Sequence, residues 1–163
     1  MSAIDDVLRS NEHYAVGFAK GDLPSPPARK LAIVVCMDAR IDPARALGLE
    51  EGDAHVIRNA GGIVTDQEIR SLAISQRKLG TEEVMLIHHT RCGMLGFDDG
   101  AFARELESDA GRAPSWAAGG FEDVDADVRE SMRRVRESPF LVHTDRVRGF
   151  VYEVETGRLR EVV

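Results

Sequence analysis

The sequence contains few cysteines, few aromatic residues and fewer basic than acidic residues. Its 163 residues include two cysteines, Cys36 and Cys92, and one tryptophan. A chain of this length buries enough apolar surface to fold without disulfide staples. In a reducing compartment, a lone pair of cysteines favours metal binding or catalysis over a disulfide. Both thiols are therefore candidate metal ligands.

The excess of acidic over basic residues and the lack of long apolar runs argue against two classes of partner. Lysine and arginine number 21 against 28 acidic residues, which gives a formal net charge of -7. Nucleic acids and anionic membranes require concentrated positive potential, so we expect neither as a partner. No stretch approaches the roughly 18 apolar residues of a spanning helix. Residues 1–20 contain Asp5, Asp6 and Glu12 where a signal peptide needs an apolar core, so we expect a cytoplasmic protein.

Two short polar motifs follow apolar runs that have the length and composition of buried strands. After residues 31–35 comes Cys36-Met37-Asp38-Ala39-Arg40, and after residues 84–88 comes His89-Thr90-Arg91-Cys92-Gly93. Two thiolates and an imidazole provide three ligands, and three protein ligands with an open fourth position are typical of catalytic zinc. The motifs therefore predict one zinc ion per chain, bound by Cys36, His89 and Cys92.

The order of the expected elements predicts an α/β fold with a single domain over residues 1–163. We expect a mostly parallel four-stranded sheet with a C-terminal antiparallel edge strand, helices on both faces and an N-terminal helical arm. The arm would occupy residues 1–27 and the catalytic core residues 28–163. Because parallel strands end at one edge of a sheet, the two motifs meet there if their strands are neighbours. Strands are expected at 31–35, 54–57, 84–88, 148–154 and 159–163, and helices at 3–19, 42–48, 65–80, 97–107 and 121–138.

Asp38 and Arg40 alternate with Cys36, so an extended backbone would point all three side chains to one side. One interpretation is a surface ion pair beside a metal. The other is catalytic: an ionised Asp38 accepts a hydrogen bond from solvent on the metal, and Arg40 keeps Asp38 ionised and off the ion. The same carboxylate is also a candidate fourth zinc ligand, which would close the site.

Three motifs in this order resemble those of the β-class carbonic anhydrases. They are Cys-x-Asp-x-Arg at Cys36, Arg-Asn-Ala-Gly at Arg58, and His-x-x-Cys-Gly at His89. The resemblance extends over essentially the whole chain and is greatest to the compact bacterial members. It implies a zinc lyase, carbonate dehydratase, in which zinc-bound hydroxide converts carbon dioxide reversibly to bicarbonate and a proton. It also implies Cys36, His89 and Cys92 as ligands, with Asp38 and Arg40 as the catalytic pair.

The resemblance carries further expectations about the assembly and the pocket. Family members form dimers or tetramers of dimers, with a substrate cleft at the subunit interface, so the N-terminal arm would embrace a second copy. Gly61 and Gly62 are expected either to shape the pocket wall or to form a purely structural turn. Pro27 stands where many members have a glutamine that contributes to substrate binding, so the contacts to substrate differ here.

Two other functions remain open from the sequence. Some proteins that resemble this family hydrolyse carbonyl sulfide or carbon disulfide with the same zinc motifs, so the motifs do not separate these substrates. A non-catalytic zinc-binding regulatory protein is the alternative from another class. Against it, a structural zinc site does not need Asp38 and Arg40, and such a site prefers four protein ligands.

Overall fold

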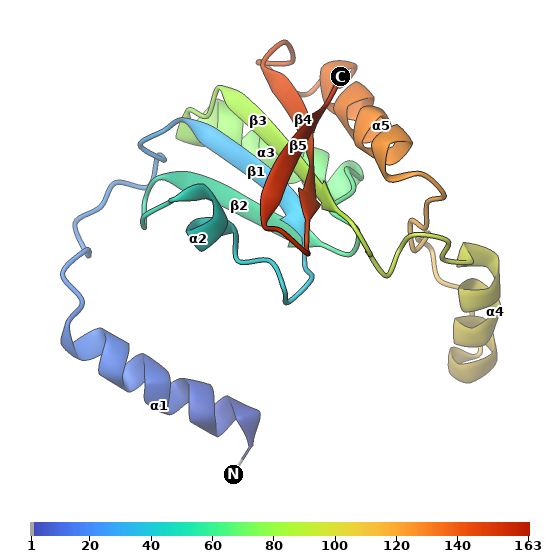
Figure 1. Ribbon diagram of the computed structural model, residues 1–163, viewed down its shortest axis with the longest axis horizontal. Helices are drawn as coiled ribbons and strands as arrows, with labels where there is room; N and C mark the ends of the chain where they lie inside the picture. The colour runs from blue at the N-terminus through green and yellow to red at the C-terminus, as the bar shows by residue number, and fades with distance from the viewer. Residues whose placement is uncertain (1) are drawn as a thin grey trace.

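A five-stranded sheet forms the centre of the computed structural model, which describes residues 2–163 (Figure 1). The strands are β1 (Leu31–Cys36), β2 (Ala54–Asn59), β3 (Glu83–His89), β4 (Val147–Glu153) and β5 (Arg158–Val162). The helices are α1 (Ala3–Val16), α2 (Pro43–Leu47), α3 (Asp66–Leu79), α4 (Asp99–Ala110) and α5 (Val124–Arg136). None of the helices among these residues is long and apolar enough to cross a membrane.

The strand order β2-β1-β3-β4-β5 confirms the predicted topology. Strand β1 pairs in parallel with β2 and β3, and β3 pairs in parallel with β4. Only β5 runs antiparallel, along β4 at the edge. Because β1 and β3 are neighbours, the segments that follow their carboxyl ends lie side by side. That adjacency is what the predicted metal site required.

Both faces of the sheet are covered, but unequally (Figure 1). Helices α3 and α5 pack on one face, where Leu72, Val128 and Val34 of β1 belong to one buried cluster. The short α2 packs on the other face, against the cluster that contains Val35 and Cys36. Successive residues of β1 point to opposite faces and are almost all fully buried, as expected for a parallel strand covered on both sides. The predicted placement of helices on both faces is therefore confirmed.

Side-chain caps define the two helices on either side of β2. The Asp42 carboxylate accepts from the backbone N–H of Arg45 at the start of α2, and Gly48 ends this helix with a φ of 62°. Thr65 and Glu68 form a reciprocal capping box at the start of α3. Both helices begin at the predicted positions because the caps are local in sequence.

The bounds predicted for the last two helices are wrong by a few residues. Helix α4 begins at Asp99 rather than at residue 97, because Asp98 caps it by accepting from the backbone N–H of Ala101. Helix α5 begins at Val124 rather than at residue 121. Phe121 instead forms a bridge with Leu95 and is buried in the cluster beside Cys36 and Cys92. Its apolar side chain therefore packs in that cluster and does not form part of a helix face.

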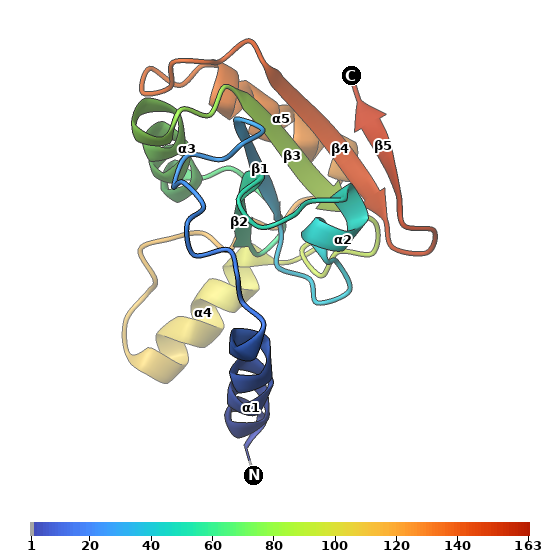
Figure 2. The same cartoon turned by 90° about the vertical axis from the view of Figure 1, so that its left-hand side faces the viewer.

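Helix α1 is an arm that stands apart from the sheet, as does α4 (Figure 1 and Figure 2). A capping box at Ser2 and Asp5 starts α1, and none of its residues is buried. Tyr14 donates a hydrogen bond to Glu51 at 3.0 Å, and Lys20 pairs with the same carboxylate. The expected helical arm is thus present, whereas the boundary at residues 27 and 28 stays a prediction.

Gly62 lies where the backbones of β1 and β3 leave no room for a side chain. A Cβ there would lie 2.7 Å from the carbonyl oxygen of Ile87 and 2.8 Å from the backbone nitrogen of Cys36. Gly80 has the same φ of +73° but open space around it. It is therefore a matched control that separates conformational strain from steric overlap.

We expect Gly62→Ala to lower the free energy of unfolding by about 3 kcal/mol or more, since left-handed strain and overpacking add. Gly80→Ala should cost only the strain, about 1 kcal/mol. Urea denaturation followed by circular dichroism measures both values. Equal losses in the two variants would show that the contact with β1 and β3 contributes nothing.

Candidate metal centre

The three predicted ligands converge at the carboxyl ends of the two central strands. Cys36 is the last residue of β1, His89 is the last residue of β3, and Cys92 lies in the turn that follows. Their ligand atoms all lie within 4.8 Å of one another, and all three residues are buried. Neither cysteine forms a disulfide. The structure therefore brings together donors separated by 53 to 56 positions.

His89 presents one free ring nitrogen to this cluster. Its Nδ1 lies 2.8 Å from the carbonyl oxygen of Thr90, which only accepts, so Nδ1 carries the proton. Nε2 is buried and has no hydrogen-bond partner among residues 2–163. A buried polar atom without a partner is costly unless it binds something else. The free lone pair on Nε2 is what a metal ligand requires, and the Thr90 carbonyl fixes the ring orientation.

The two thiols lie close enough together that each shifts the pKa of the other. As a hydrogen-bond donor, Cys92 holds the pKa of Cys36 well below its usual range, against the opposing effect of burial. Backbone N–H groups of Asp38 and Gly61 also favour the Cys36 thiolate. That thiolate and burial raise the pKa of Cys92. A divalent ion would displace the remaining proton, and two thiolates with one imidazole are a donor set that fits Zn2+.

Asp38 lies beside the ligands and is bound by Arg40. Arg40 donates from Nε to Oδ1 at 2.9 Å and from Nη2 to Oδ2 at 2.7 Å. These bonds, with the backbone N–H of Arg40, hold the pKa of Asp38 well below its usual range despite partial burial. Asp38 Oδ2 is 3.7 Å from His89 Nε2, which is too long for a hydrogen bond. The carboxylate thus borders the candidate metal site while its hydrogen bonds go to Arg40.

The backbone that produces this pair differs from the expected extended segment. The N–H of Ile41 donates to the carbonyl oxygen of Asp38 at 3.0 Å, and the N–H of Arg40 donates to the Asp38 carboxylate at 2.9 Å. The chain therefore turns after Asp38, and the prediction of simple alternation from Cys36 to Arg40 is wrong. A side chain that binds the backbone two residues ahead stabilises such a turn.

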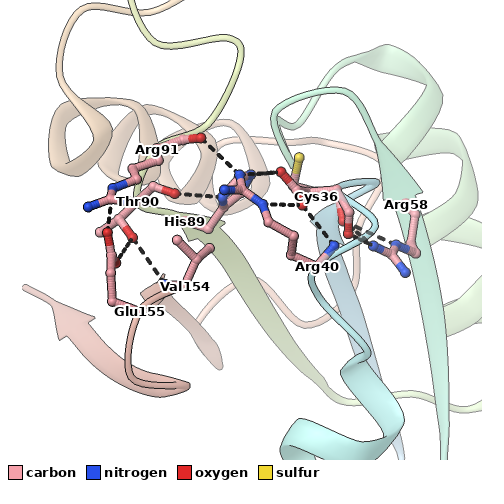
Figure 3. A network of polar contacts seen from close by, with 9 residues as sticks. Cys36, Arg40, Arg58, His89, Thr90, Arg91, Val154 and Glu155 are labelled. Carbon is pink, nitrogen blue, oxygen red and sulfur yellow. Dashed lines mark hydrogen bonds and ion pairs between the residues drawn. The ribbon is translucent and has the colours of Figure 1, made fainter.

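Arg58, at the end of β2, holds the first motif in place (Figure 3). It donates to the carbonyl oxygen of Cys36 at 2.8 Å and 3.1 Å, and to that of Asp38 at 2.8 Å. These carbonyls lie at the last residue of β1 and two residues beyond it. The contacts of Arg58 are therefore with the backbone of the first motif.

Sequence reasoning did not single out Thr90, Arg91 or Glu155, all of which bind around the second motif. Thr90 and Arg91 lie inside the motif, so their positions were visible but their contacts were not. Glu155 lies 63 residues after Cys92, in the turn between β4 and β5. It reaches the motif only because β4 pairs with β3, and no local pattern indicates that contact.

The fold and the site together define a class of protein. It has a mostly parallel α/β sheet, with two buried cysteines and a histidine at the carboxyl edge where such sheets bind ligands. An aspartate held by an arginine borders these three donors.

Comparisons with known proteins identify the family within that class. A family model described as carbonic anhydrase matches residues 31–117. The chain is 54% identical to beta-carbonic anhydrase 1 of Mycobacterium tuberculosis over 162 residues, covering 99% of each chain. It is 34% identical to a carbon disulfide hydrolase of an Acidianus species over 183 residues, covering 97% of this chain and 88% of the other.

A solved structure agrees with these sequence relatives. The carbonic anhydrase from Streptococcus mutans superposes with a TM-score of 0.92 at 41% identity, covering 100% of this chain and 99% of the other. The chain belongs to the β-carbonic anhydrase family, as the three motifs predicted. Zinc is the cofactor of this family, and the donor set of Cys36, His89 and Cys92 fits it.

Proposed function

We propose that this chain catalyses the reversible hydration of carbon dioxide to bicarbonate and a proton. One zinc ion per chain would be held by Cys36, His89 and Cys92. The observation that carries the proposal is the convergence of these three donors beside an Asp38 carboxylate that two hydrogen bonds from Arg40 hold. A structural zinc site would not need that pair. The family relatives named as carbonic anhydrases support the same activity.

When bound, zinc would act as a Lewis acid that activates water as a nucleophile at neutral pH. Two thiolates cancel the charge of the ion, so its effect on water is weaker here than with three neutral imidazoles. Asp38 would compensate for that difference. An ionised carboxylate only accepts hydrogen bonds, so Asp38 Oδ2 would orient the attacking solvent without returning a proton to it.

Arg40 has two tasks in this proposal. Its guanidinium keeps Asp38 ionised, and its two hydrogen bonds occupy both carboxylate oxygens. Asp38 is otherwise a candidate fourth ligand, and a carboxylate on the metal would take the position that solvent needs. Gly61, whose N–H favours the Cys36 thiolate, and Gly62, packed between β1 and β3, would complete the wall of the site.

The direct test compares three substrates on the same preparation. Stopped-flow hydration of carbon dioxide is measured with a pH indicator, and release of sulfide is measured from carbonyl sulfide and from carbon disulfide. We expect fast hydration, with zinc near one ion per chain. The carbon disulfide hydrolase relative makes the second activity the main competitor. Fast sulfide release with negligible hydration would replace the proposal, and inactivity toward all three would favour the regulatory alternative.

We also propose that the chain works as a homodimer or a tetramer of dimers in the cytoplasm, with the substrate cleft between subunits. The two free thiols suit a reducing compartment. Helix α1 supports self-association because Ile4, Val7 and Leu8 form an apolar face that lies 57% to 68% exposed. An unpartnered apolar face of this kind usually marks an interaction site.

Leu8→Glu should weaken self-association by at least about a hundredfold. Burying one leucine contributes about 2 kcal/mol, and a two-fold symmetric interface buries it twice. His13→Glu, an exposed position on the polar side of the same helix, is the control and should associate like the wild type. Sedimentation velocity over a range of concentrations measures both variants. If Leu8→Glu associates as strongly as the wild type, the apolar face of α1 is not part of the interface.

A further inference from the structure

Arg91 has a backbone conformation that its residue type disfavours. Its φ is +53°, in the left-handed region that glycine occupies at no steric cost. For a residue with a side chain this conformation costs roughly 1–2 kcal/mol. Surrounding contacts must therefore hold Arg91 there, and such strained residues cluster at functional sites.

The strained backbone of Arg91 contacts Arg40. The carbonyl oxygen of Arg91 accepts a hydrogen bond from Arg40 Nη2 at 3.0 Å. The same Nη2 donates to Asp38 Oδ2. The Arg40 guanidinium is thus fixed between the carboxylate of the first motif and a carbonyl of the second. The conformation of Arg91 decides where that carbonyl points.

Glu155 holds the segment that contains Arg91 (Figure 3). One carboxylate oxygen, Oε1, lies 2.5 Å from Arg91 Nε, and the other, Oε2, accepts from the Thr90 hydroxyl at 3.0 Å. The Thr90 hydroxyl also accepts from the backbone N–H of Val154 at 3.1 Å. One side chain from the β4–β5 turn therefore binds two consecutive residues of the second motif.

Both residues that Glu155 binds act on the site through their carbonyl groups. The Thr90 carbonyl accepts from His89 Nδ1, and the Arg91 carbonyl accepts from Arg40 Nη2. Glu155 itself is kept ionised, because its own backbone N–H and the Thr90 hydroxyl lower its pKa. A surface ion pair ordinarily contributes little. The Glu155 interactions differ because the two residues that Glu155 binds are themselves hydrogen-bonded to His89 and Arg40.

We propose that Glu155 is a positioning residue for Arg40 and His89. It holds Thr90 and Arg91 in the turn whose carbonyl oxygens orient the His89 ring and the Arg40 guanidinium. The part that concerns catalysis rests on the proposed function, in which Arg40 controls Asp38. Without Glu155, the Arg91 backbone relaxes out of the left-handed region and Arg40 loses its second anchor.

The test uses Glu155→Ala and Glu155→Gln, with Glu161→Ala as the matched control. Glu161 lies on the same hairpin, is 40% exposed against 41% for Glu155, and also pairs with an arginine, Arg148. The first readout is the water-exchange rate of the Arg40 Nε–H in zinc-loaded, 15N-labelled protein, assigned by its loss in Arg40→Lys. The second readout is kcat/KM for hydration, with zinc content measured on the same samples.

Glu155→Ala should raise the Arg40 exchange rate at least about fivefold and lower kcat/KM about tenfold, with zinc unchanged. Glu155→Gln should give an exchange rate and a kcat/KM between those of Glu155→Ala and the wild type, because its side-chain amide oxygen still accepts from the Thr90 hydroxyl. Glu161→Ala should match the wild type in both measurements. An unchanged Arg40 exchange rate in Glu155→Ala, or an equal change in Glu161→Ala, would overturn the inference. If the wild type lacks hydration activity but Arg40 responds to Glu155, the proposed function fails and the positioning role stands.

Discussion

His89→Gln is expected to abolish zinc binding and to lower kcat/KM for hydration by more than about a thousandfold. The substitution removes a buried ring nitrogen that has no hydrogen-bond partner among the described residues and that belongs to the cluster with both cysteine sulfurs. Two thiols alone leave half of a tetrahedral shell to solvent, and affinity falls steeply with the number of protein ligands. Metal analysis after gel filtration should give less than about 0.1 zinc per chain.

His55→Gln is the matched control for that variant. His55 lies in the neighbouring parallel strand β2, and its Nδ1 is 2.8 Å from the Ser75 hydroxyl, away from the site. It should retain about one zinc per chain and wild-type activity. The His89 variant should also match wild-type protein stripped with a chelator in its melting temperature, since zinc stabilises only the chain that binds it. A full zinc complement in His89→Gln would refute the ligand assignment.

Parts of the fold were predictable where the information is local. Thr65 with Glu68, and Asp42 with Gly48, start or end helices through contacts within five residues, and the structure places those ends as predicted. Phe121 shows the opposite case. Its apolar side chain extends the periodic pattern of α5, yet it is buried in the cluster with Cys36 and Cys92 and not in the cluster that contains Val128 and Met132. Periodicity alone does not reveal which cluster an apolar residue joins.

The candidate site likewise contains residues that could be predicted from the sequence and residues that could not. The three donors could be predicted because each follows an apolar strand, and parallel topology brings strand ends together. The pairing of Asp38 with Arg40 was expected, but from an extended backbone that the structure replaces with a turn. Glu155 could not be predicted because its contact with Thr90 depends on the register of β3 and β4 across 65 positions.

Asp38→Asn is expected to lower kcat/KM for hydration by about a hundredfold to a thousandfold while zinc stays bound. Groups that hold a reacting proton in place contribute roughly this much. The amide replaces one acceptor oxygen with an NH2 donor, which faces either the Arg40 guanidinium or the attacking solvent. Either orientation loses the acceptor-only character that the mechanism needs. The three metal ligands are untouched, so the loss should appear in turnover and not in metal content.

The pH dependence separates the tasks of Asp38 and Arg40. Arg40 holds the pKa of Asp38 well below its usual range, so the ionised form persists as pH falls. Any stability that this depressed pKa provides is present above the unfolded value, about 3.9, and is lost as pH falls through the folded value. In Arg40→Gln the pKa should rise toward 3.9, so acid inactivation begins at a higher pH than in the wild type. Stopped-flow rates between about pH 3 and 7 measure the shift, because the titration of a carboxyl with a pKa near 3.9 falls within that window.

Asp53→Asn is the control that makes the Asp38 result specific. Asp53 pairs with Arg29 at 3.0 Å and is 19% exposed against 16% for Asp38, but it lies at the opposite ends of β1 and β2. The same chemical change there removes a comparable ion pair far from the metal ligands. We therefore expect Asp53→Asn to keep wild-type turnover. If Asp38→Asn also keeps it, the carboxylate beside His89 is only a surface partner of Arg40, and the catalytic role proposed for the pair is wrong.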